Sequence, residues 1–300
     1  SEAQLVGFPQ SKHLATMDCA RALLLPAQPG VLPEMTFYFS SKSDQTLEVQ
    51  LRRSSLEGNY TPDETLETLS LLIPAGEAMP VTAKFSAEIA ENEYVFVCLM
   101  ACPGVEIVQS ESHHTGVMPL VHTANKKVAK DAVQTPPDGA GFDRFEFWLP
   151  ERRPVGKLPA VTFNPPLSGF GADQLGSDYA RPLIQSNAWV ADLSDEKPTL
   201  ELIWESPKKI QKVIIFFDVD YDHAMETVQW HHAEDAMPFC VKHYRLYDGA
   251  DNLLAEDREN HKGRVELNVS EPVETNQLKL ELLDTHGATA SIFSIQVYSA

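Results

Sequence analysis

Apolar and polar residues alternate along most of this chain, and long stretches of helical periodicity are scarce. Successive side chains of a strand point to opposite faces, so a period of two predicts strands with one buried face. Short strands separated by glycine and proline predict a β-sandwich, which we place in residues 1–122. The first half contains six such segments: 36–40, 47–51, 69–73, 81–85, 95–99 and 105–107.

The second half repeats the alternation, and we place a second domain in residues 164–300. A glycine-containing stretch at 247–252 separates two alternating segments and predicts a hairpin loop. Six or more strands around one core predict a jelly-roll sandwich. The expected fold is all-β, with two β-sandwich domains. The alternating segments are 200–204, 213–217, 241–246, 253–255, 265–269, 278–282 and 292–297.

The segment between them, residues 123–163, is predicted to be a linker followed by an aromatic connector. Its first part has few apolar residues and no periodicity. Phe142, Phe145, Phe147 and Trp148 then follow closely on one another. Such a segment could be a ligand platform or an apolar strap that holds one domain to the next, and we favour the strap.

The chain of 300 residues has a formal net charge of −19 at pH 7, spread over both halves without a basic stripe. Nucleic-acid binding depends on cations that neutralise phosphates, so we expect no nucleic-acid partner. No apolar run is long enough to span a bilayer, so we expect no membrane insertion. Four cysteines do not suggest a disulfide framework, and free thiols are expected. The compartment stays open, with a secreted or periplasmic location favoured over a cytoplasmic one.

Three short motifs carry a resemblance across residues 165–299. They are the loop NAWVAD from Asn187 to Asp192, the strand TLELIW and the closing strand SIFSIQVY. In this order and spacing they resemble the discoidin (coagulation factor V/VIII type C) superfamily. The resemblance implies that the second domain is a galactose-binding-like jelly roll, which binds ligands with its loops and performs no chemistry.

A second resemblance extends further along the chain. FEFWLPERRP, FDVDYDHAMETV, MPFCVKHYRL and the loop residues Ala180–Pro182 and 259–261 are similar to the C-terminal region of bacterial FAD-dependent oxidoreductases. This resemblance implies a bacterial source and a flavoenzyme domain as partner. The chain lacks a strand-GxGxxG-helix unit, because GAGFDR at 139–144 has no third glycine. We therefore expect no FAD, and no other cofactor apart from a possible structural calcium.

The candidate ligand residues are expected in loops at one end of the second sandwich. An aromatic ring stacks on the apolar face of a sugar, while amide, carboxylate and guanidinium groups bind its hydroxyls. For Trp189 the alternative is that its ring closes the end of the sandwich. The predicted residues are Arg181, Asn187, Trp189, Asp192, Trp230, His231, Asn260 and His261.

Asp218, Asp220 and Asp222 form the densest group of candidate metal ligands. Carboxylate oxygens suit calcium, but His223 and Gln229 break the EF-hand pattern. A structural calcium site and a strand that runs into a solvated acidic turn are the two interpretations. No zinc motif accompanies the adjacent histidines His231 and His232.

The chain has no GxSxG motif, so no residue is predicted to be catalytic and we expect no enzymatic activity. The expected function is a non-catalytic carbohydrate-binding or accessory module of a bacterial protein, with a glycan as partner. The alternative is a structural, substrate-cleft region of an FAD-dependent oxidoreductase whose flavin domain is absent from this chain.

Overall fold

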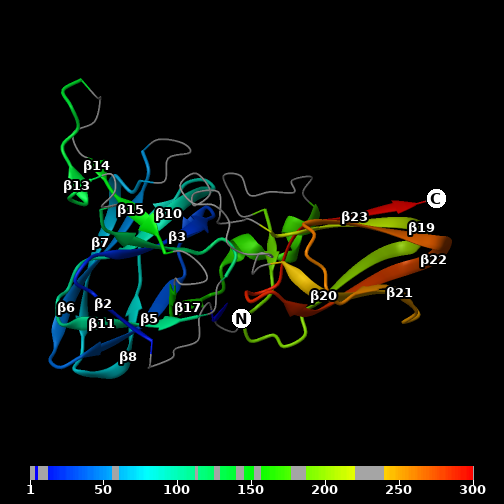
Figure 1. The fold of residues 1–300 in the computed structure, drawn as a ribbon, viewed down its shortest axis with the longest axis horizontal. Coiled ribbons are helices and arrows are strands. Elements are labelled where there is room, and N and C mark those ends of the chain that lie inside the picture. Colours follow the sequence, from blue (N-terminus) through cyan, green and yellow to red (C-terminus); the bar gives the residue numbers. More distant parts are fainter. Residues whose placement is uncertain are drawn as a thin grey trace. The chain divides into compact units, whose positions relative to one another are not determined.

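The computed structural model describes residues 4–5, 13–55, 61–111, 114–124, 129–139, 145–151, 157–176, 187–219 and 240–299. The chain divides into two units, Ser1–Leu167 and Ser168–Ala300. Apart from the short 3-10 helices η1 (Ser168–Phe170) and η2 (Ala172–Gly176), the regular elements of the described residues are strands (Figure 1). The prediction of an all-β chain is confirmed. No helix of the described residues has the length and hydropathy to cross a membrane.

Two antiparallel sheets form the first unit, in the orders β1-β17-β5-β11-β16 and β15-β12-β3-β10-β6-β7. In the first sheet β2 also pairs with β11 and β8 with β5. Its strands are β1 (Gln4–Leu5), β2 (Leu14–Thr16), β5 (Glu34–Ser41), β8 (Gly76–Ala83), β11 (Val105–Ser110), β16 (Leu158–Pro159) and β17 (Val161–Asn164). The second sheet contains β3 (Arg21–Ala27), β6 (Gln45–Arg53), β7 (Glu64–Ile73), β10 (Glu93–Leu99), β12 (Met118–His122) and β15 (Trp148–Pro150). Two short pairs, β4 (Gly30–Val31) with β9 (Glu88–Ile89) and β13 (Val133–Gln134) with β14 (Phe145–Glu146), complete this unit.

The segment predicted to connect the domains contributes strands to the first unit instead. β17 pairs with β5, and β15 pairs with β12, so that Trp148 lies opposite His122. Trp148 is 7% exposed, and its indole N–H donates to Glu146 at 3.0 Å. The boundary between the units lies after Leu167, and the described residues 145–150 and 158–164 pair with strands of the first unit. These strands are two to four residues long, too short for alternation to reveal them.

The described residues of the second unit form one six-stranded sheet in the order β18-β23-β19-β22-β20-β21. β19 and β22 are long, and each joins two segments that alternation predicts as separate strands. The first part of β19 pairs with the last part of β22, whereas its last part pairs with β23 and the first part of β22. Register shifts interrupt these ladders, so the sheet bends and folds into two layers (Figure 1). The strands are β18 (Trp189–Val190), β19 (Thr199–Phe217), β20 (Val241–Asp248), β21 (Leu253–Asp257), β22 (Arg264–Thr285) and β23 (Ser291–Ser299).

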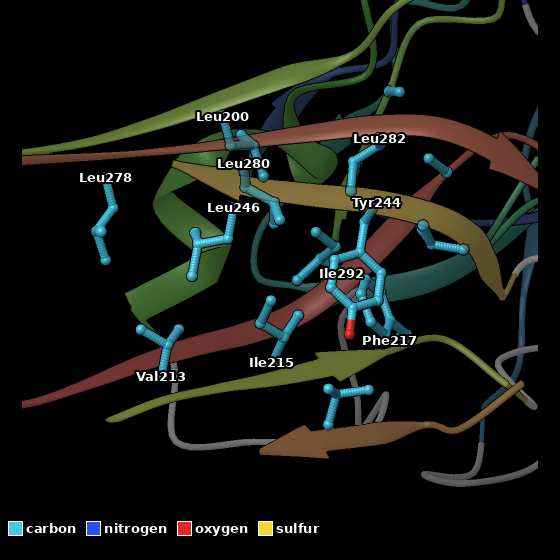
Figure 2. Close-up of a cluster of buried hydrophobic side chains, with 14 of the residues drawn as sticks. Leu200, Val213, Ile215, Phe217, Tyr244, Leu246, Leu278, Leu280, Leu282 and Ile292 are labelled. Carbon is cyan, nitrogen blue, oxygen red and sulfur yellow. The ribbon is translucent and has the colours of Figure 1, made fainter. Parts of the chain in front are cut away.

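The core of the second unit lies between these layers. In Figure 2 the side chains of the two layers point toward one another. Tyr244 is 1% exposed, and its ring centroid lies 5.5 Å from that of Phe217. The remaining labelled members are Leu200, Val213, Ile215, Leu246, Leu278, Leu280, Leu282 and Ile292. The sandwich predicted for the second half of the chain is confirmed.

The predicted hairpin loop joins β20 to β21. The Asp248 carboxylate accepts hydrogen bonds from the backbone N–H groups of Ala250 and Asn252, each at 2.9 Å. Asp251 has a φ of 60°, which a short polar side chain tolerates. Local turn chemistry therefore fixes the register of this hairpin.

Glu256 on β21 joins the hairpin strands through charged groups. Its Oε1 accepts hydrogen bonds from Arg245 at 2.8 Å, His243 at 2.9 Å and Arg258 at 3.1 Å. These bonds, the one from Arg245 foremost, lower the pKa of Glu256 from 4.5 to about 2. A carboxyl group with a lowered pKa stabilises the folded state above its unfolded pKa, and this contribution is lost as the pH falls through its folded pKa.

We therefore expect the stability of the protein to depend on Glu256 in the acidic range. The urea midpoint of the parent chain should fall between about pH 5 and about pH 2, and Glu256→Gln should fall less steeply over the same range. Glu205→Gln, an exposed change on β19, is the control and should follow the parent. Equal slopes for the parent and Glu256→Gln would contradict the assignment.

Candidate functional site

One end of the second unit brings together five segments that are far apart in the sequence. We call this the loop end and define it as residues 187–192, 217–219, 240–241, 258–263 and 284–291. Four backbone hydrogen bonds, with N···O distances from 2.7 to 3.3 Å, connect these segments. They join Ala191 to Ala290, Asp218 to Ser291, Phe217 to Gly263 and His286 to Cys240.

Three of the predicted ligand residues lie on the first of these segments. Asn187 is 1% exposed and has a φ of 50°, in the left-handed region that asparagine tolerates. Trp189 is partly buried and packs against the core of the second unit. Asp192 is half-buried, and its Oδ1 accepts hydrogen bonds from the backbone N–H of Ser194 at 2.8 Å and its hydroxyl at 2.5 Å. The Asp192 side chain therefore holds the turn that follows it.

Asn260 holds two strands and its own loop together. It is 1% exposed, and its Nδ2 donates to the carbonyl of Val241 at 2.8 Å. Its Oδ1 accepts from the backbone N–H of Lys262 at 3.1 Å. His286 adds a contact of 2.7 Å from Nε2 to the carbonyl oxygen of Asn260. The structure thus places Asn260 as a residue that shapes the loop, and its predicted ligand contact stays a prediction.

Sequence reasoning missed His286 as a member of this end. It occurs singly in a short loop without a motif, and only the pairing of β22 with β20 brings it to Asn260. His261, in contrast, is exposed, and its Nδ1 lies 3.3 Å from the carbonyl oxygen of Glu259. Among the predicted ligand residues that the structure describes, His261 is therefore the most exposed.

Arg181, Trp230 and His231 lie outside the described residues, as do Asp220 and Asp222. Val219 and Cys240, the described residues on either side of 220–239, both belong to the loop end. The predicted roles of these five residues stay predictions.

Asp218 and Cys240 are the buried ionisable groups of the loop end. Both are fully buried, and burial raises the pKa of the Cys240 thiol to about 12, with the Asp218 carboxylate adding to the effect. Asn260 Nδ2 donates to Cys240 Sγ at 3.6 Å. The thiol therefore stays protonated at neutral pH, which makes it a packing group and not a nucleophile.

Among the described residues, no three histidine, cysteine, aspartate or glutamate side chains form a group that could hold a metal ion. Asp218 alone does not make a calcium site. Its neighbours in the predicted set, Asp220 and Asp222, are outside the described residues.

The calcium site predicted from the sequence has a direct test. If calcium binds at Asp218, Asp220 and Asp222, a chelator should lower the melting temperature of the full chain and added calcium should restore it, because the bound ion stabilises the folded state. Magnesium at the same concentration is the control ion. A melting temperature that does not respond to chelator would contradict the prediction and leave an acidic turn.

No family model matches the sequence, and no curated protein matches it. Among solved structures, the family 32 carbohydrate-binding module of EndoD from Streptococcus pneumoniae shows 13% identity and a TM-score of 0.35, over 44% of this chain and 88% of that one. The family 32 module of NanJ from C. perfringens, in complex with galactose, shows 16% identity and a TM-score of 0.33, over 44% and 87%. A fucose-binding module from Streptococcus pneumoniae shows 15% identity and a TM-score of 0.32, over 44% and 85%. At these values the similarity assigns neither a ligand nor residue roles to this chain.

Proposed function

We propose that this protein is a non-catalytic carbohydrate-binding or accessory module, and that the loop end of its second unit binds the glycan. One observation carries the proposal. Backbone pairing brings segments that contain Trp189, Asp192, Asn260 and His261 to the same end of one sandwich. These residue types supply the ring surface and the hydrogen-bonding groups that sugar recognition uses.

The chemistry of the described loop end favours binding over catalysis. The Cys240 thiol is buried and protonated, and the Asn260 amide bonds to the backbone of its own unit. A rigid sandwich that presents loops at one end is a suitable scaffold for recognition without a conformational change.

The binding site is tested with the full chain on an array of glycans. We expect reproducible binding to a sugar class, and His261→Ala should weaken it about tenfold, as expected on losing one well-made polar contact. The melting temperature should stay unchanged because His261 is exposed. Isothermal titration with the best array ligand gives the affinity.

The matched control is Lys208→Ala. Lys208 is also exposed but lies on β19 opposite Thr275, away from the loop end. It should leave both the affinity and the melting temperature unchanged. A blank array, or a loss of binding caused equally by Lys208→Ala, would contradict the proposed site.

A further inference from the structure

We infer that the loop end binds glycans without anionic groups in preference to sugars that carry carboxylate or sulfate. This inference rests on the proposed function and narrows its ligand class. It follows from the distribution of charge at the loop end and from the partners of the cationic side chains there.

Carboxylates outnumber cations around the loop end. The described residues of the loop end contain four aspartate and glutamate residues, of which Asp218 is fully buried, and two lysine and arginine residues. The acids are Asp192, Asp218, Glu259 and Asp284, and the bases are Arg258 and Lys262.

Two cations at or next to the loop end, Lys242 and Arg258, have acidic partners. Lys242 Nζ, at the start of β20, lies 3.8 Å from Glu259 and 3.9 Å from Asp284. Arg258 donates to Glu256 at 3.1 Å, and this carboxylate has a strongly lowered pKa. An anionic sugar would have to compete with these internal carboxylates for Lys242 and for Arg258. Recognition of carboxylate or sulfate ordinarily uses unpaired arginine or lysine donors.

The experiment compares glycans that differ only in charge. The full chain is titrated with a galactoside, its 3-sulfated and sialylated forms, and an amino-sugar oligomer, in low and in physiological salt. We expect both anionic forms to bind about five- to tenfold more weakly than the neutral one in low salt, with a smaller difference at higher salt because ions screen the repulsion. The amino-sugar oligomer should bind at least as well as the neutral form.

A charge-reversal variant tests whether the loop end is responsible. Glu259→Lys with Asp284→Lys changes two exposed residues and should reduce the discrimination to about twofold. Glu205→Lys with Glu274→Lys makes the same change in net charge at exposed positions of β19 and β22 away from the loop end, and should leave it unchanged.

The outcomes separate the two proposals. Equal or tighter binding of the anionic forms would overturn the inference while leaving the glycan-binding function in place. Absence of binding to every sugar would overturn the proposed function and the inference together. An equal response to both charge-reversal pairs would show that net charge, and not the loop end, sets the selectivity, and would also overturn the inference.

Discussion

Tyr244→Ala is expected to lower the free energy of unfolding of the second unit by about 3–5 kcal/mol. Tyr244 is 1% exposed, and its ring packs against Phe217 from the opposite layer. Removing the ring deletes buried apolar surface and leaves a cavity between the two layers, where the folded sheet can close only in part. Burial also raises the pKa of Tyr244 to about 12, so its hydroxyl stays neutral.

Urea unfolding followed by tryptophan fluorescence measures this effect, since Trp189 and Trp204 both pack against the same core. Hydrogen exchange of the β20 amides assigns the loss to the second unit. Tyr298→Ala is the matched control: Tyr298 is 42% exposed, with Lys212 4.6 Å from its ring, so the cost should be about 0.5 kcal/mol. Equal losses for the two tyrosines would contradict the assignment of Tyr244 to the core.

Asn260→Ala is expected to cost about 2–3 kcal/mol of unfolding free energy and to weaken glycan binding with it. The change removes the partner of the Val241 carbonyl and of the Lys262 N–H while both lie close to the buried amide. The loop that carries His261 then loses its side-chain attachment to β20 and keeps the backbone bond from Asn260 N–H to the Lys242 carbonyl. Thermal unfolding and titration with the array ligand give the two quantities.

The neighbouring residue supplies the control for Asn260. His261→Ala should leave stability within about 0.5 kcal/mol of the parent, as is usual for exposed positions, while weakening binding. A variant Asn260→Ala that keeps full stability but loses binding would show that the amide contacts the ligand directly. That result would restore the sequence-based assignment of Asn260 and overturn its role in shaping the loop.

Alternation identified strands that bury one face, such as β5, but it missed β3, which is covered on both faces. The strand β5 buries Met35, Phe37 and Phe39 while its intervening residues are half-buried, so its sequence shows a period of two. β3 is buried along nearly its whole length and reads RALLLPA, a continuous apolar run without alternation. A sequence pattern cannot assign such a run to a strand without knowing what covers each face.

The composition of the candidate site was predictable, but its geometry was not. Asn187, Trp189, Asp192, Asn260 and His261 were named from residue type and loop position. The folding of β19 and β22 into two layers determines which of them are buried. Asn260 and His261 are adjacent in sequence, yet one is 1% exposed and bonded to β20 while the other is exposed.

By itself, the sequence determined the all-β class, the sandwich of the second half, most long strands and the hairpin at Asp248. These properties depend on the alternation of apolar residues and on local turn chemistry, which a linear pattern contains. Only the tertiary structure decided that the aromatic connector belongs to the first unit and that His286 meets Asn260. Both follow from pairing between distant strands, and the register of such pairing depends on the packing of the whole core.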